Sequence, residues 1–140
     1  MTNAIEKVNI NTLMADGVGA SYCSIDAAAG DMDSKKKVYN ALNNPDFKVS
    51  DFINKKICVV DVLIEVSQLV NEETGEADIV PRVVLIDKDG KAYQAVSKGI
   101  FSAIRNAVQV FGAPSWPDGI VFEVKQKQVG RGSMLTLDIV

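Results

Sequence analysis

The ten residues "ICVVDVLIEV" (57–66) constrain the fold of this chain more than any other segment. Apolar residues recur at every second position from Cys58 to Val66, and Asp61 and Glu65 fall on the opposite face. A period of two is typical of a β-strand with one buried face, because successive side chains point to opposite sides of a sheet. We therefore expect a long half-buried strand that begins near Lys56, with Cys58 as a small buried residue.

The later segments alternate in the same way, with one change of period. We expect strands at 79–86 ("IVPRVVLI"), 91–96 ("KAYQAV"), 120–127 ("IVFEVKQK") and 133–140 ("SMLTLDIV"). Gly90 supplies the positive φ of the turn between the first two of these strands. Between 97 and 111 the apolar residues recur every three or four positions, which predicts a helix capped by Ser97 and ended by Gly112.

The order of elements from residue 56 onward is strand, strand, strand, helix, strand, strand. This is the order of the five-stranded oligonucleotide/oligosaccharide-binding (OB) barrel, in which the helix between strands three and four plugs one end. We expect such a fold, mostly β with helices. An open α+β sheet is the alternative, because the order of strands in space is not readable from the sequence.

The first third of the chain has a different composition. The stretch "MADGVGASYCSIDAAAGD" is rich in Gly, Ala, Ser and Asp, which predicts an irregular N-terminal arm over residues 1–34. A short helix is predicted at 33–44, with Asp33 and Ser34 as capping candidates and Pro45 after its end. We expect a single OB-fold domain over residues 35–140 with this short helix leading it.

Composition argues against several classes of function. The chain has 140 residues, a formal net charge of -3 and no histidine. The usual catalytic triads and the commonest metal ligand are therefore missing, and Cys23 and Cys58 form no CxxC pattern. We expect no cofactor, no metal site and no enzymatic activity. The N-terminus has no long apolar stretch, so we expect no membrane partner and a place in the cytoplasm.

Basic residues gather in the last predicted hairpin in spite of the acidic net charge. Lys125 and Lys127 share one face of a strand, and Arg131 lies between two glycines in the turn "VGRG". In an OB barrel this turn joins strands four and five, and it is one of the loops that hold an oligonucleotide. A flexible basic tip can follow a phosphodiester backbone. The alternative is a surface hairpin whose lysines only serve solubility.

Strands two and three, which form the binding face of OB barrels, carry further candidates. Arg82 and Lys91 offer positive charge, and Tyr93 offers a ring on which a base can stack or which packs at the barrel rim. Trp116 is a second candidate ring, although a large aromatic residue beside a helix end also fits the core. The loop at 71–78 opposes this interpretation, because its carboxylates repel phosphate: Glu72, Glu73, Glu76 and Asp78.

Three segments together resemble the small single-stranded-DNA-binding proteins of tailed bacteriophages. They are "VYNALNNPDF", "VPRVVLIDKDGKAYQAVSKGIFSAI" and "FEVKQKQVGRGSMLTLDIV", and the resemblance covers the chain from about Lys35 to its end. It implies an OB fold that coats single strands with little sequence preference during replication or recombination, without a cofactor. It implies replication or recombination proteins as further partners, and it points to the same residues: Arg82, Lys91, Tyr93, Lys125, Lys127 and Arg131.

Two other classes of function remain as alternatives. One is a protein–protein interaction barrel that serves as a structural or complex component, for which the basic hairpin would have no role. The other is a nuclease of OB type, which would cleave single strands in the presence of a divalent metal. The oligomeric state stays open, and an oligomer is compatible with each of the three hypotheses.

Overall fold

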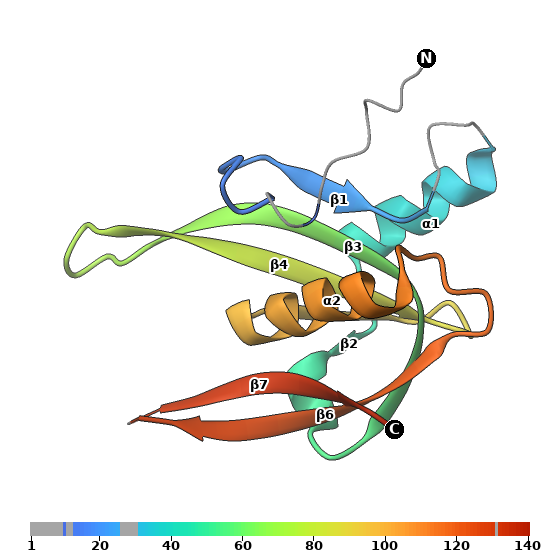
Figure 1. Ribbon diagram of the computed structural model, residues 1–140. Helices are drawn as coiled ribbons and strands as arrows, with labels where there is room; N and C mark the ends of the chain where they lie inside the picture. The colour runs from blue at the N-terminus through green and yellow to red at the C-terminus, as the bar shows by residue number, and fades with distance from the viewer. Residues whose placement is uncertain (1–9, 11–12, 26–30, 131) are drawn as a thin grey trace.

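The computed structural model describes residues 10, 13–25, 31–130 and 132–140 (Figure 1). In these ranges the fold consists of one seven-stranded sheet, two α-helices and a short 3-10 turn. The elements in chain order are β1 (Ser21–Cys23), α1 (Met32–Asn43), β2 (Phe47–Lys48), the turn Val49–Phe52, β3 (Lys56–Val70), β4 (Ala77–Asp87), β5 (Ala92–Val96), α2 (Lys98–Phe111), β6 (Ile120–Val129) and β7 (Gly132–Ile139).

Strand β3 organises the sheet, because it pairs with three other strands. The strand order is β2-β5-β4-β3-β6-β7, and β1 pairs with β3 outside this path. β3 pairs with β4 from Val59 to Val70, with β6 at its start, and with β1 near its middle. A single strand that serves successive partners has to be long, and here it bends with the sheet (Figure 1).

The register of β3 shifts between Val59 and Asp61, and this irregularity corrects the predicted alternation. Before the shift the core residues are Ile57 and Val59, whereas after it they are Val62, Ile64 and Val66. A bulge places two residues opposite one, so the buried face changes parity. Cys58 is consequently half-buried rather than part of the core, and the prediction of Cys58 as a buried residue was wrong.

Asp61 is the second consequence of the shift, because it is only 5% exposed. Its Oδ1 accepts a hydrogen bond from Ser24 Oγ at 2.8 Å and another from Ser115 Oγ. Ser24 Oγ in turn accepts from the backbone N–H of Val62 at 2.9 Å. A buried carboxylate needs such donors. Asp61 therefore ties the segment after β1 and the connection after α2 to the central strand.

Helix α2 lies inside the curl of the sheet, between β4 and the β6–β7 pair (Figure 1). Ile100, Phe101 and Ile104 point into the main core. Ser97 caps the helix as predicted, since its Oγ accepts from the N–H of Ile100 at 3.1 Å. The helix ends at Gly112, whose φ is 88°. The predicted stripe is thus buried from Ile100 to Ala107, whereas Phe111, predicted to belong to the core, is 50% exposed.

The predicted five-stranded OB barrel is shown only in its coarser part, a mostly-β curled sheet with two helices. From residue 56 the elements follow the expected order, but β1 and β2 join the sheet as additional strands. In the described part of the chain β5 and β7 do not pair with each other, and the sheet stays open as a curled half-barrel (Figure 1). The first turn of α2 lies against β7 instead, so that a Cβ on Gly99 would collide with the carbonyl oxygen of Leu135.

Helix α1 covers the outer face of the sheet. Its Ala41 joins a second, smaller core with Leu63 of β3, Val84 and Ile86 of β4, and Ala92 of β5. The helix has the predicted position, but its cap is Asp31, whose Oδ1 accepts from the N–H of Ser34 at 2.6 Å. Asp33 and Ser34 were the wrong candidates for this cap. The chain itself therefore covers part of the outer face of β4 and β5, the two strands predicted to carry binding residues.

Much of the predicted N-terminal arm, residues 1–9, 11–12 and 26–30, lies outside the described residues. The described part packs on the sheet, because Leu13 is fully buried and β1 pairs with Leu63–Glu65. The division into an arm at 1–34 and a domain at 35–140 stays a prediction.

Candidate nucleic-acid interface

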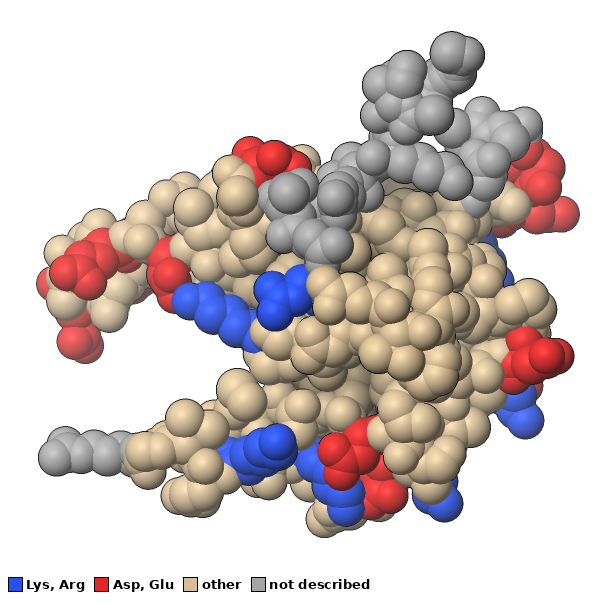
Figure 2. Space-filling view, in the orientation of Figure 1, with Lys and Arg blue, Asp and Glu red and all other residues tan. Residues whose placement is uncertain are grey.

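Two strand pairs extend from the body on the same side of the molecule, β3–β4 and β6–β7 (Figure 1). We call their outer ends the β3–β4 arm (residues 68–79) and the β6–β7 arm (residues 126–134). The described residues of both arms are exposed, which means that neither end is covered by the core. Figure 2 shows the open hollow between the two arms. An extended polymer therefore has free access to both of them.

The basic residues of β6 lie on its outer face. Phe122 and Val124 are buried in the main core, and Lys125 and Lys127 point to the opposite side, as predicted. Lys56 of β3 pairs with Glu123, so its side chain lies on that same outer face. Lys56, Lys125 and Lys127 form what we call the β6 basic strip. Arg131, the remaining residue predicted in this hairpin, lies outside the described residues.

Two carboxylates lie within the strip and moderate its charge. Lys125 Nζ is 2.7 Å from Glu123 Oε2, and this hydrogen bond raises the pKa of the lysine and lowers the pKa of the glutamate. Asp138 pairs with Glu123 across β6 and β7. Lys127 lies farther out, opposite Met134, and it is exposed. Lys127 is therefore the lysine of the strip whose charge is most available to a phosphate.

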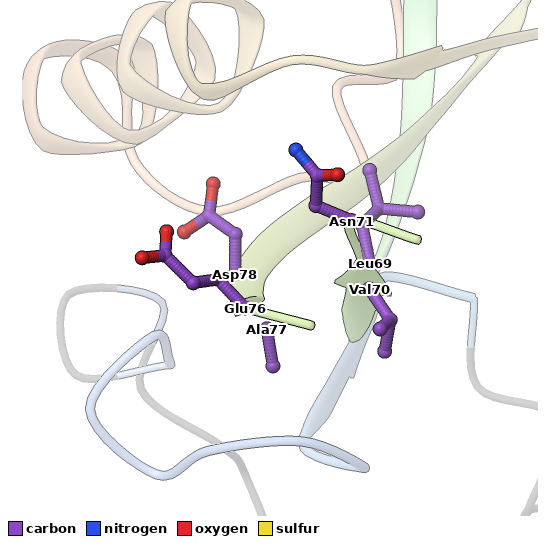
Figure 3. A pocket seen from close by; sticks show the side chains of 6 residues that line it. All are labelled: Leu69, Val70, Asn71, Glu76, Ala77 and Asp78. Carbon is purple, nitrogen blue, oxygen red and sulfur yellow. The ribbon is translucent and has the colours of Figure 1, made fainter. Parts of the chain in front are cut away.

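The β3–β4 arm has the opposite charge, since Glu72, Glu73, Glu76 and Asp78 are all exposed along it. Figure 2 shows acidic side chains over the tip of this arm. A shallow hollow of about 490 Å³ lies between its strands, lined by Leu69, Val70, Asn71, Glu76, Ala77 and Asp78 (Figure 3). Its charged groups are carboxylates, so it repels a phosphate instead of holding one. Of the two arms, the β3–β4 arm is thus the acidic one, and the lysines lie on β6.

Arg82 holds α1 on the sheet. Its side chain is only 15% exposed, and it forms an ion pair with Glu65 at 3.0 Å. Its guanidinium also donates to Gln94 Oε1 and, at 2.6 Å, to the carbonyl oxygen of Leu42 at the end of α1. A guanidinium with three internal acceptors has little left to offer a ligand. Burial and bonding therefore argue against the predicted contact of Arg82 with DNA.

Tyr93 is 7% exposed, and its ring packs against Phe47 and Phe52 with centroids 5.1 and 5.0 Å away. Its hydroxyl donates to Asp87 Oδ2 at 2.8 Å. A side chain on which a base stacks needs a free ring face. The enclosed ring of Tyr93 therefore argues against the predicted stacking role. Trp116 is also 7% exposed, and its Nε1 donates to the carbonyl oxygen of Gly112. Of the two roles predicted for Trp116, a ring for stacking and a core residue, the structure shows the core position.

The structure brings some of the predicted residues together and separates others. Lys125 and Lys127 are neighbours on one face of β6, while Tyr93 points into the core from β5. Arg82 lies on the other face of the sheet, under α1. Lys91 is exposed in the turn before β5, where its backbone N–H donates to Asp87. The predicted set is therefore not one surface, and only the residues of β6 form a continuous strip.

Sequence reasoning missed an aromatic pair close to the β6 basic strip. Phe47 is 39% exposed, and its ring meets that of Phe52 edge-on at 5.3 Å. The Nζ of Lys55 lies 5.7 Å from the centroid of the Phe52 ring. The carbonyl oxygen of Lys55 accepts from the N–H of Val124, which places this segment beside β6. The interleaving of aromatic and basic residues in "DFKVSDFINKK" was the signal available in the sequence.

Comparison with known families decides the class of protein. The family model described as "Phage Single-stranded DNA-binding protein", of the Phi29 type, matches residues 18–140. The chain belongs to this family. It is a protein that binds single-stranded DNA in phage-type replication, and members of this family are DNA-binding structural proteins, not enzymes. The resemblance noted from the sequence is thereby confirmed, and membership favours DNA binding over the nuclease and over the interaction barrel.

The other comparisons add no relative. Neither the curated proteins nor the solved structures contain a match to the chain. In the described ranges no helix has the length and apolar character that crossing a membrane requires.

Proposed function

We propose that this family member binds single strands along the β6 basic strip, with little sequence preference, during replication or recombination in the cytoplasm of the host cell. The observation that carries this proposal is the separation of charge between the arms. Lysines line the outer face of β6, and the exposed carboxylates Glu72, Glu73, Glu76 and Asp78 lie on the other arm. Contacts to phosphate bind any sequence, because every nucleotide carries the same charged group.

In this proposal base stacking is assigned to Phe47, with Phe52 packed beside it, instead of to Tyr93. Phe47 is the exposed member of the aromatic cluster, and Lys55 adds a positive charge beside the Phe52 ring. An aromatic face accepts any base, which is consistent with binding that tolerates sequence. We also propose that the curled sheet is an open variant of the OB barrel, that the protein can oligomerise, and that replication or recombination proteins are further partners.

Titration of a fluorescent oligo-dT at several salt concentrations tests this function. We expect affinity to fall as salt rises, because bound phosphates release counterions. Lys127→Gln removes one exposed charge and is expected to reduce the magnitude of the slope of log K against log salt by about 0.7. Phe47→Leu keeps an apolar side chain but removes the flat ring, so it is expected to weaken binding without changing the slope.

Lys98→Gln is the matched control for the charge. Lys98 is also exposed, but it forms an ion pair with Asp78 of the acidic arm at 3.5 Å. We expect this variant to retain the slope of the unchanged protein. The proposal fails if oligo-dT does not bind at low salt, or if Lys127→Gln and Lys98→Gln change the slope equally.

A further inference from the structure

We propose that the solvent-facing side of α1 is a second contact surface for single-stranded DNA, in which Lys35 and Lys36 bind phosphates and Tyr39 stacks on a base. This inference rests on the proposed function, and it adds a surface on a different side of the molecule. Figure 1 shows α1 at the end of the molecule opposite the tips of the two arms. A strand that meets both surfaces has to pass around the body.

The position of α1 determines which of its residues are available. Ala41 is buried in the second core, and Val38 and Leu42 pack against that core. Arg82 donates to the carbonyl oxygen of Leu42 and holds the C-terminal end of the helix on the sheet. One side of α1 is therefore attached to the outer face of β4, and the opposite side faces solvent.

The solvent-facing side combines positive charge with an exposed ring. Tyr39 is 63% exposed, although a tyrosine is large and amphipathic enough to pack against a core. Lys35 and Lys36 precede it by four and three positions, and side chains at these spacings are neighbours on a helix. Both lysines are exposed, as is Lys37. An aromatic ring flanked by lysines is the combination that binds single strands without sequence readout.

The charges of this surface are not balanced within the part of the chain that the structure describes. None of the ion pairs found among those residues includes Lys35, Lys36 or Lys37. From Lys35 to the end of α1 there is no Asp or Glu. Asp31 caps the helix through the N–H of Ser34. Asp33, in the first turn, lies three and four positions before Lys36 and Lys37, and among the described residues it forms no ion pair with them. A free phosphate chain therefore finds no competing carboxylate between Lys35 and Asn43.

The stability of helix α1 does not explain why Lys35, Lys36 and Lys37 are at these positions. They lie in the N-terminal half of α1, and the last turn of the helix contains no basic residue. The positive end of the helix dipole is at the N-terminus, so lysines there are slightly unfavourable, whereas lysines in the last turn would be stabilising. The arrangement is better explained by an anionic ligand, and for a member of this family the anionic ligand is single-stranded DNA.

The experiment compares short and long oligo-dT on the full chain. The short oligomer has about 8 nucleotides, within the usual site size of one small barrel, and the long one is about five times longer. Lys35→Gln/Lys36→Gln is expected to reduce the magnitude of the salt slope on the long oligomer by about 1.4. Tyr39→Ala is expected to weaken binding of the long oligomer about 5-fold or more at an unchanged slope.

The controls separate this inference from the proposed function. Lys98→Gln, at the exposed start of α2, is expected to leave the slope unchanged. All α1 substitutions are at exposed positions, and thermal melting checks that the variants fold. If the unchanged protein does not bind oligo-dT, the proposed function fails. If it binds, and Lys127→Gln lowers the slope while both α1 variants bind the long oligomer as Lys98→Gln does, only the α1 surface is overturned.

Discussion

At the scale of single residues, Tyr93 was predicted to bind DNA, but its surroundings give it a role in the stability of the fold. Its ring is enclosed by Phe47 and Phe52, and its hydroxyl donates to Asp87. Burial, the hydrogen bond to Asp87 and the nearby carboxylates together raise the pKa of Tyr93 from its ordinary value of 10.0 to about 12. The folded state therefore retains the phenol proton at a pH where the unfolded chain loses it.

This difference predicts a loss of stability in alkali. The full contribution of Tyr93 is present below pH 10, and it is lost as the pH rises through about 12. Two pKa units correspond to roughly 3 kcal/mol in the free energy of unfolding. Urea unfolding at pH 9 and at pH 12 measures the change, and Tyr93→Phe is expected to show a smaller decrease between these two pH values. An equal decrease in both proteins would contradict the role of this hydroxyl.

At the scale of elements, the contact between α2 and β7 takes the place of the strand pairing that would close a barrel. Gly99 makes it possible, because the helix start lies directly on the backbone of Leu135. A Cβ at residue 99 would also lie 2.6 Å from Cγ of Met134. The glycine is therefore required for close approach of a helix to a strand.

Gly99→Ala is expected to lower the free energy of unfolding by about 1–3 kcal/mol, the usual cost of overpacking. Alanine is the better helix former by about 1 kcal/mol, but the clash involves backbone that cannot move without opening the contact. Asn106→Ala is the matched control, since residue 106 is exposed on the same helix. We expect urea unfolding to show no loss for the control. Equal stability of Gly99→Ala and the unchanged protein would refute the contact.

At the scale of the whole molecule, the distribution of charge matters more than its sum. The net charge is -3, yet the exposed carboxylates of the β3–β4 arm and the lysines on the outer face of β6 lie on different arms of the molecule. A polyanion that approaches is repelled by one arm and attracted by the other. Separation of this kind orients the ligand before contact, and it weakens as salt screens the charges.

Glu72→Gln/Glu73→Gln is therefore expected to strengthen binding of oligo-dT by roughly twofold or more at low salt. The gain should disappear at high ionic strength, where the Debye length falls to a few ångströms. Asp118→Asn removes an exposed carboxylate outside the arm and is expected to have little effect. Fluorescence titration at both salt concentrations measures the difference. Unchanged affinity at low salt would show that the acidic arm does not act on the ligand.

The sequence determined the elements that depend on local pattern. The presence of the long strand β3, the stripe of α2 from Ile100 to Ala107, the Ser97 cap and the Gly90 turn were predicted correctly, because alternation, helical spacing and turn chemistry act over a few residues. The face of β6 on which its lysines lie was also predicted correctly. Their neighbours Phe122 and Val124 are apolar and had to be buried.

Which surfaces stay open depends on long-range packing, which no local pattern reveals. Nothing local to Arg82 or Tyr93 indicates that α1 would cover one and that Phe47 and Phe52 would enclose the other. The register shift in β3, which buries Asp61, depends on the partner strand and on serines distant in the chain. Burial is a property of what packs against a residue. A sequence specifies the candidates for contact with DNA, and long-range packing selects among them.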